Sequence, residues 1–470
     1  MGEPGNCAAE YTMRGAVCYI SDRRIRFVPR VNWLFMDRRT FLAGLGGGAA
    51  CAQSSGSRRP NFLVIFSDDQ GWNDVGCFGS EIPTPHIDAI ARNGVRFEQF
   101  YAAGPVCTPS RYGLLTGRYP ARSRGRLMNA LMPPSKEGIY PGETTVAEAL
   151  KGRGYRTGII GKWHLGSARP EYLPTRHGFD RFDGFLHGCV DFFDFTYGGM
   201  KNWYRDEKPF DPPRGYTTDY ITDRAIGFLR ENRGEPFFLY VAHNAPHYGK
   251  ASYDPATGKA ANTLQAPGEY IRRFAHIRDE DRRVYTAMVS SMDDNIGRLM
   301  RALREAGLEE NTVVLFLSDN GGAPDFGGRN APWRGRKGEL FEGGIRVPCV
   351  MQWKGRIAAG RTVRQPAGNV DVFPTFCALA GAEAPAGLDG RDLVPVLFGN
   401  RPFDRDLFWR IGQSDACRAG SWKYIRLASG EELLFDIERD PRETTNLAGD
   451  AAALARVKRE YARLAATLAR

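Results

Sequence analysis

Four short apolar runs constrain what this 470-residue chain can fold into. Each run is continuous rather than alternating, which is the pattern of a strand buried on both faces of a parallel sheet. The runs cover residues 62–66, 158–160, 236–241 and 313–317. Helical stretches separate them, at residues 145–151, 219–231 and 280–306. This alternation predicts an α/β fold with a large mixed, mostly parallel sheet sandwiched by helices.

The pattern changes after residue 400. Short strands are predicted at residues 406–409, 422–426 and 432–436, followed by a helix at residues 451–468. They indicate a small α+β subdomain with an antiparallel sheet. We therefore expect an N-terminal extension at residues 1–52, a main domain at residues 58–400 and a C-terminal subdomain at residues 401–470.

A twin arginine marks the N-terminal extension. Arg38 and Arg39 follow Met36 and precede a short, weakly apolar stretch of small residues that ends at Cys51. This order is typical of a bacterial twin-arginine export signal near a start codon, so we expect translation from Met36 and a periplasmic or extracellular protein. A disordered basic tail is the alternative. The residues before Cys51 also suggest a lipoprotein site, although Gly48 stands where a larger apolar residue is usual.

Charge, hydropathy and cysteine content exclude several classes of protein. The net charge of +10 is scattered without a basic stripe, so we predict no nucleic-acid partner. A basic surface suits a small anionic substrate equally well. No apolar run reaches the ~18–20 residues that span a bilayer. The nine cysteines are widely spaced and predict neither a disulfide framework nor a zinc site.

Polar side chains follow all four apolar runs. The first run leads into Asp68 and Asp69 and the fourth into Asp319 and Asn320, while the other two lead into the segments 161–166 and 242–247. Carboxyl ends of parallel strands meet at one edge of a sheet, where ligands bind. Three carboxylates and an amide oxygen are hard ligands that suit Ca²⁺, with Mg²⁺ as the alternative. Either acidic pair taken alone is equally compatible with a turn or a helix cap.

Residues 107–111, Cys-Thr-Pro-Ser-Arg, lie between these strands, with Leu114 and Thr116-Gly117-Arg118 beyond. This segment resembles the modification motif of the formylglycine-dependent sulfatases, of the arylsulfatase type within the alkaline phosphatase superfamily. The segments 161–166 and 335–338 match the same family in the right order, and the resemblance runs from about residue 60 to the C-terminus.

The resemblance implies an alkaline phosphatase-like fold and a sulfuric ester hydrolase. A formylglycine-generating maturase would oxidise Cys107 to formylglycine, whose hydrate attacks sulfur with one hydroxyl and releases sulfate through the second. The implied metal ligands are Asp68, Asp69, Cys107, Asp319 and Asn320.

The resemblance also implies roles for five further residues. Arg111 steadies the hydrate, and Lys162 and Lys337 bind the sulfate group. His164 acts as the base that starts breakdown of the intermediate, and His247 binds sulfate and protonates the leaving oxygen. His243, four residues before His247, is expected to be structural.

The sequence constrains the identity of the substrate less than it constrains the reaction. His187 and Asp191 lie in an aromatic-rich segment, residues 184–193, which either contacts a sugar or packs in the core. A sulfated polysaccharide or glycosaminoglycan fragment is the expected substrate and an arylsulfate the next. The alternatives are a phosphate or phosphonate monoester hydrolase of the same superfamily and a catalytically silent carbohydrate-binding relative.

Overall fold

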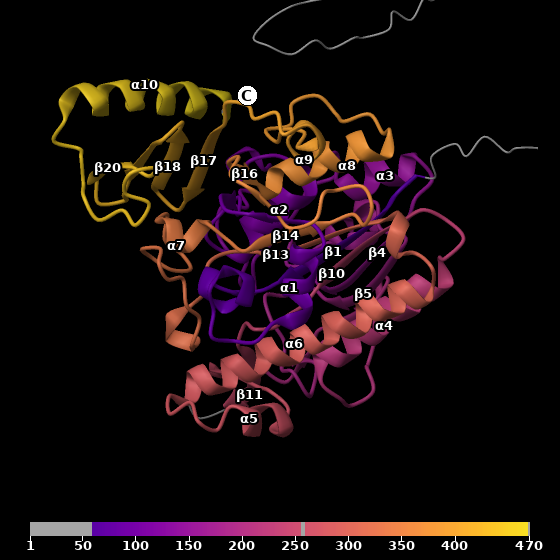
Figure 1. Cartoon of the computed structure of the whole chain (residues 1–470). Coiled ribbons are helices and arrows are strands. Elements are labelled where there is room, and N and C mark those ends of the chain that lie inside the picture. Colours follow the sequence, from indigo (N-terminus) through magenta and orange to yellow (C-terminus); the bar gives the residue numbers. More distant parts are fainter. Residues whose placement is uncertain (1–58, 255–258, 469–470) are drawn as a thin grey trace, which may run out of the picture. The chain divides into compact units, whose positions relative to one another are not determined.

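The computed structural model describes residues 59–254 and 259–468 (Figure 1). The predicted export signal, the start at Met36 and the lipoprotein site all lie outside the described residues. Among the described residues, no helix has the length and apolar character needed to cross a membrane.

The main sheet has ten strands, and its centre is parallel. Strands β13, β1, β10, β4 and β5 run parallel, while antiparallel pairs attach β14 and β2 on one side and β8 and β9 on the other. This confirms the predicted mixed, mostly parallel sheet. In spatial order the strands are β15 (Arg361–Val363), β2 (Val95–Phe97), β14 (Cys349–Gln352), β13 (Thr312–Ser318), β1 (Asn61–Ser67), β10 (Phe237–Ala242), β4 (Arg156–Lys162), β5 (Arg181–Phe185), β8 (Trp203–Arg205) and β9 (Lys208–Pro209).

Helices cover both faces of this sheet, and β1 shows why. Its side chains alternate: Phe62, Val64 and Phe66 enter one core, and Leu63 and Ile65 enter the other. The first core is closed by α2 (Cys107–Thr116), α3 (Val146–Gly152), α8 (Val372–Ala380) and α9 (Val394–Gly399). The second is closed by α1 (Pro85–Arg92), α4 (Thr217–Glu231) and α6 (Glu280–Glu305), so the sheet lies between two helical layers (Figure 1).

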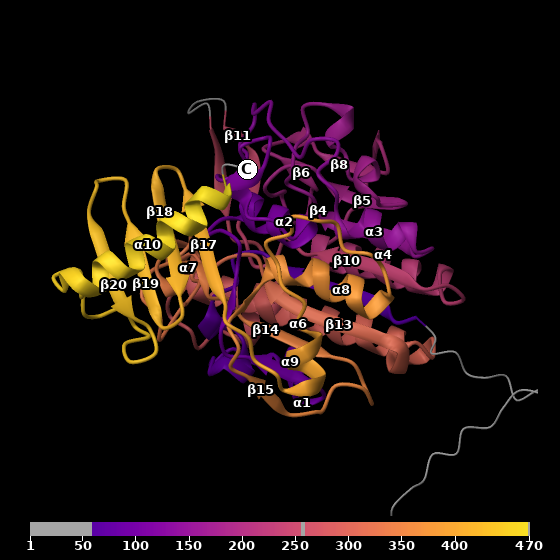
Figure 2. The same ribbon diagram turned by 90° about the horizontal axis from the view of Figure 1, so that it is seen from above.

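The C-terminal sheet is antiparallel with four strands, one more than predicted. Its strands are β17 (Asp406–Ile411), β18 (Ser414–Ala419), β19 (Trp422–Arg426) and β20 (Glu432–Asp436), and α10 (Ala451–Leu468) lies across one face (Figure 2). On that face Val457 and Leu464 of α10 join the same core cluster as Phe408 and Tyr424 of the sheet. The unpredicted strand is β18, which has little apolar pattern of its own.

The remaining described α-helices and strands are short. They are β3 (Phe100–Tyr101) paired with β16 (Ala367–Gly368), β6 (Thr196–Tyr197) with β7 (Met200–Lys201), β11 (Gly249–Asp254) with β12 (Lys259–Thr263), α5 (Gly268–Arg273) and α7 (Glu342–Ile345).

Asp293 links α6 to α1, and its protonation should make the stability of the fold depend on pH. Its buried carboxylate accepts hydrogen bonds from the backbone N–H groups of His86 and Ile87 at the start of α1, at 3.1 and 2.8 Å. Burial raises the pKa of Asp293 to about 7, and Asp88 and Asp294 add to the rise. Because the folded state holds this proton more tightly than the unfolded state, the stabilisation is full below pH ~4 and is lost as pH rises through 7.

We therefore expect Asp293→Asn to unfold with a weaker pH dependence than the wild type. The fall in melting temperature between pH 5 and pH 8 should shrink, because the wild type loses about 2–3 kcal/mol of this stabilisation as pH rises from 5 to 7. Thermal unfolding followed by circular dichroism measures this. Asp223→Asn, at a side chain that is 59% exposed, is the control and should match the wild type. An unchanged pH dependence in Asp293→Asn would contradict the assignment.

Candidate active site

The two acidic pairs meet where β1 and β13 end. These strands run in register, with Ser67 opposite Ser318, so the residues that follow them are neighbours. The backbone N–H of Asp69 donates to Asp319 Oδ1 at 3.1 Å, and the amide of Asn320 donates to Asp69 Oδ1 at 2.8 Å. Asp69 has a positive φ of 61°, a conformation that costs energy outside glycine and persists where the surroundings impose it.

Three cationic side chains face the three carboxylates. Lys162, the last residue of β4, places Nζ 2.5 Å from Asp68 Oδ2. Lys337 Nζ lies 2.7 Å from Asp69 Oδ2, and Arg111 Nη2 of α2 lies 2.9 Å from Asp319 Oδ2. Five of these six groups are buried and the Lys337 side chain is 19% exposed, and their burial is tolerated because each has a partner of opposite charge.

The pKa values of the carboxyl groups reflect this arrangement. Burial opposes ionisation of Asp69, but Lys337 and His247 outweigh it and lower its pKa to about 2. Burial and the neighbouring charge of Asp68 raise the pKa of Asp319 to about 7, against the effect of Arg111. Such opposed shifts among buried carboxyl groups are typical of functional sites.

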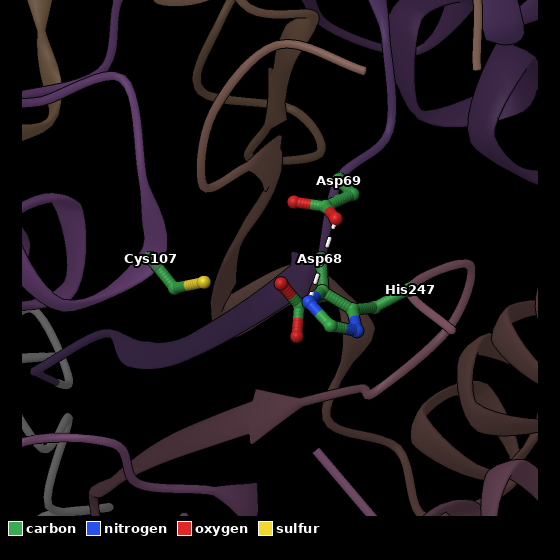
Figure 3. A group of neighbouring side chains, drawn as sticks. All are labelled: Asp68, Asp69, Cys107 and His247. Carbon is green, nitrogen blue, oxygen red and sulfur yellow. Dashed lines mark ion pairs between the residues drawn. The ribbon is translucent and has the colours of Figure 1, made fainter. Parts of the chain in front are cut away.

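Cys107 lies at the first position of α2 and joins this group. Ligand atoms of Asp68, Asp69, Cys107 and His247 all lie within 4.8 Å of one another, and all four residues are buried. Figure 3 shows the thiol of Cys107 directed toward the carboxylate of Asp68, with His247 beside Asp69. Burial raises the pKa of the Cys107 thiol to about 11, although Lys162 and Lys337 oppose the rise.

Two oxygens at this site fit a cation. Asp68 Oδ1 and Asn320 Oδ1 are buried without a hydrogen-bond partner in the described part of the chain. Buried oxygens are normally bonded, so two orphans side by side with charged carboxylates indicate a ligand. The donor set is carboxylate and amide oxygen, which suits Ca²⁺ or Mg²⁺. Asp69 and Asp319 each have both carboxylate oxygens bonded to protein donors, whereas Asp68 keeps Oδ1 free of them.

His247 is fixed in one tautomer by its backbone. Its Nδ1 lies 2.7 Å from the carbonyl oxygen of Tyr248, so Nδ1 carries the proton. Its Nε2 then accepts from Lys337 Nζ at 3.1 Å. Burial and the Lys337 charge lower the pKa of His247 to about 3, which keeps the imidazole neutral.

His164 sits in the segment after β4 with a positive φ of 57°. Its Nε2 lies 2.7 Å from the carbonyl oxygen of Leu131, which requires Nε2–H, and Nδ1 has no partner in the described residues. Burial, together with Lys162, lowers the pKa of His164 well below its usual range. A neutral imidazole with an unpaired Nδ1 can accept a proton.

The structure separates the three other predicted candidates. His187 is half-buried and lines a small pocket with His164, Met132 and Glu137. Asp191 instead uses both carboxylate oxygens internally, toward the backbone N–H groups of Phe193 and Asp194 and the amide of Gln265. We therefore leave Asp191 out of the substrate contacts. His243 is fully buried, and neither ring nitrogen has a partner in the described residues.

Sequence reasoning missed the residues that hold Asp69 in place. The hydroxyl of Tyr285, on α6, lies 3.1 Å from the carbonyl oxygen of Asp69 and 2.8 Å from Asp74 Oδ2. Asp74 also accepts from the backbone N–H groups of Gly71 and Arg329, at 3.1 and 2.8 Å. Tyr285 stands 216 residues from Asp69 in the chain, and no local pattern signals this contact.

We expect Tyr285→Phe to weaken divalent-cation binding about 10-fold, because outer partners orient the ligands of a metal. The free energy of unfolding should fall by only about 1–2 kcal/mol for the lost hydrogen bonds. Calorimetric titration with Ca²⁺ measures the affinity without needing turnover. Tyr155→Phe is the matched control, since the buried Tyr155 hydroxyl has no partner among the described residues. Equal Ca²⁺ affinity in both variants would contradict the positioning role.

Comparisons with known proteins agree with this geometry. Residues 60–382 match the family model "Sulfatase", and residues 336–468 match "N-sulphoglucosamine sulphohydrolase, C-terminal". The chain is 35% identical to steryl-sulfatase of Mus musculus over 73% of its own length and 66% of that protein's length. It is 35% identical to N-acetylgalactosamine-6-sulfatase of Sus scrofa, covering 76% of this chain and 69% of that one.

Solved structures extend the match to the whole fold. The chain resembles Ps i-CgsB in complex with k-i-k-neocarrahexaose, with a TM-score of 0.77, 33% identity, and coverage of 84% of this chain and 90% of that one. A phosphonate monoester hydrolase of Agrobacterium radiobacter shares the fold, with a TM-score of 0.62 at 23% identity, and covers 87% of this chain and 95% of that one. The chain belongs to the sulfatase family.

Proposed function

We propose that this sulfatase hydrolyses sulfate monoesters of carbohydrates, with formylglycine made from Cys107 as nucleophile. One observation carries the proposal: Cys107 Sγ and the ligand atoms of Asp68, Asp69 and His247 all lie within 4.8 Å of one another. Lys162 and Lys337 are bonded to those same carboxylates. The nucleophile, the anion-binding lysines and the cation ligands are thus gathered at the edge of the sheet where its parallel strands end.

Formylglycine, once formed and hydrated, supplies one hydroxyl for attack and a second for release of sulfate. A divalent cation at this site supplies positive charge that lowers the pKa of a bound hydroxyl and binds an oxygen of the ester. Asp68, Asp69, Asp319 and Asn320 would hold it, beside residue 107. Ca²⁺ is our choice over Mg²⁺, because Ca²⁺ accepts a larger number of oxygen ligands in flexible geometry.

Lysine, arginine and histidine side chains of the site bind the anion, move protons and orient the carboxylates. Lys162 is fully buried and neutralises the charge of the Asp68 carboxylate. The Lys337 side chain is 19% exposed and can reach a bound sulfate group. Lys337 and His247 together hold a proton next to the leaving oxygen. His164 accepts a proton at Nδ1, and Arg111 keeps Asp319 and Asp68 oriented.

Competing turnover of p-nitrophenyl sulfate and p-nitrophenyl phosphate tests this function. We expect the sulfate ester to have the higher kcat/KM in protein produced with a formylglycine-generating maturase. Faster cleavage of the phosphate, or of a phosphonate monoester, would replace the proposal with the related hydrolase. No turnover of any of these esters, with residue 107 fully converted, would indicate a silent carbohydrate-binding relative.

We infer the substrate class from structural relatives that were solved with sugar ligands. Ps i-CgsB was solved with k-i-k-neocarrahexaose, and another relative with D-glucosamine-2-N,6-O-disulfate. We propose a sulfated oligosaccharide as the natural substrate, with an arylsulfate as the next choice, and His187 as a contact to it. Export through the Arg38-Arg39 signal and transient binding of a maturase complete the proposal.

A further inference from the structure

A second cleft lies where the main sheet's loops meet the C-terminal sheet. It has a volume of about 470 Å³, within the range of ligand pockets. One wall is the segment Pro332, Trp333 and Arg334, and the other is the turn of Arg442, Glu443 and Thr444 after β20. We call it the Arg442 cleft.

The two walls of the Arg442 cleft are tied together. Arg334 Nη1 donates to the carbonyl oxygen of Glu443 at 2.9 Å, and its guanidinium stacks 4.0 Å over the ring of Phe341. Glu443 is fully buried with a positive φ of 55°. Its carboxylate accepts from the backbone N–H of Glu342 at 2.7 Å. Arg334 is therefore held in a fixed position before any ligand arrives.

The charge presented by the Arg442 cleft is positive. Among the described residues that line it, Glu443 is the only acidic one, and its carboxylate is turned inward and pairs with the buried Lys423 at 2.8 Å. Arg334 and Arg442 are exposed, and Arg442 makes no ion pair within residues 59–254 and 259–468. The Thr444 hydroxyl donates to Asp440 Oδ1 at 2.9 Å, so the two arginines are the donors that the lining offers to an anion. A cleft lined by two arginines selects an oxygen-rich anion, because guanidinium donors match sulfate and carboxylate geometry.

The Arg442 cleft and the candidate active site share one loop. Lys337 follows Arg334 by three residues, which limits their Cα separation to about 11 Å. Trp333 also packs 5.4 Å from Trp72, which follows Asp69 by three residues. A ligand that extends past the reacting sulfate by a few sugar units can therefore reach both places.

We propose that the Arg442 cleft is a subsite for a second anionic group, sulfate or carboxylate, of a multiply charged oligosaccharide substrate. The inference rests on the proposed function for its substrate class. It makes the C-terminal turn part of substrate recognition: Arg334 and Arg442 bind the distal anion, and Glu443 positions Arg334.

Binding of sulfated hexasaccharides to the Cys107→Ala protein tests the subsite without turnover. The probes are a multiply sulfated carrageenan hexasaccharide, a chondroitin sulfate hexasaccharide and the desulfated form of the first. We expect Arg442→Ala to weaken binding of at least one sulfated probe about 10-fold, which equals ~1.4 kcal/mol for a lost charge-assisted contact. Arg442→Lys should recover part of it. The slope of log Kd against log salt should fall as one ionic contact is removed.

Arg439→Ala is the matched control. It removes the same charge from the same turn, but Arg439 lies outside the cleft with a side chain that is 90% exposed. Equal losses in Arg439→Ala and Arg442→Ala would overturn the subsite, as would equal binding of sulfated and desulfated carrageenan probes or no binding of either sulfated probe. A positive binding result combined with faster phosphate than sulfate turnover would keep the subsite and reject the proposed function.

Discussion

Cys107→Ala should lower kcat/KM on p-nitrophenyl sulfate by at least about 10⁴-fold, the scale of loss when a covalent nucleophile is removed. Alanine offers neither a nucleophilic atom nor a site for oxidation, while it preserves the first turn of α2. Activity of wild-type preparations should rise in proportion to the fraction of residue 107 that is formylglycine. Intact mass of the 107 peptide measures that fraction, because the aldehyde is ~18 Da lighter than the thiol.

Cys77→Ser provides the control for this loss. Cys77 is half-buried and lies outside the cluster of Asp68, Asp69, Cys107 and His247. It should retain wild-type turnover and the mass shift at residue 107. Full activity in Cys107→Ala, or full activity in protein whose residue 107 remains a thiol, would reject the nucleophile assignment.

Strand ends explain why so much of the site could be predicted from sequence. A buried parallel strand must be apolar along its whole length, so its carboxyl end is visible as the point where polar residues begin. The structure confirms strands at all four predicted runs, as β1, β4, β10 and β13. Strands β1 and β13 pair in register. Predicting where the two strands end was therefore enough to predict that the residues after them lie close together: Asp68, Asp69, Asp319 and Asn320.

Contacts that depend on packing between distant elements could not be predicted in this way. Strand β18 reads Ser-Asp-Ala-Cys-Arg-Ala, and it is stabilised by pairing on both sides and by Asp415, which binds Arg410 and Arg426. The bond from Tyr285 to Asp69 and the use of Asp191 inside its own turn likewise follow from tertiary placement. Local propensity carries no information about such partners.

Lys337→Ala should reduce kcat and kcat/KM by a similar factor, about 10²–10³, as expected when a charge that stabilises the transition state is removed. Lys337 is the more exposed of the two site lysines, and its Nζ contacts both Asp69 and His247. Alanine leaves the Asp69 carboxylate without its ion pair and His247 Nε2 without a donor. Lys337→Arg should recover only part of the rate, because a planar guanidinium cannot replace a compact ammonium at both contacts.

Arg336→Ala separates this effect from disturbance of the loop. Arg336 is adjacent in sequence, but its side chain is 46% exposed and its guanidinium pairs with Asp325 at the surface. It should retain turnover within about 2-fold, since exposed ion pairs contribute little. If Lys337→Ala raised KM while kcat stayed constant, Lys337 would bind the ground state and the transition state equally. Lys337 would then be a substrate anchor and not a source of the proton for the leaving oxygen.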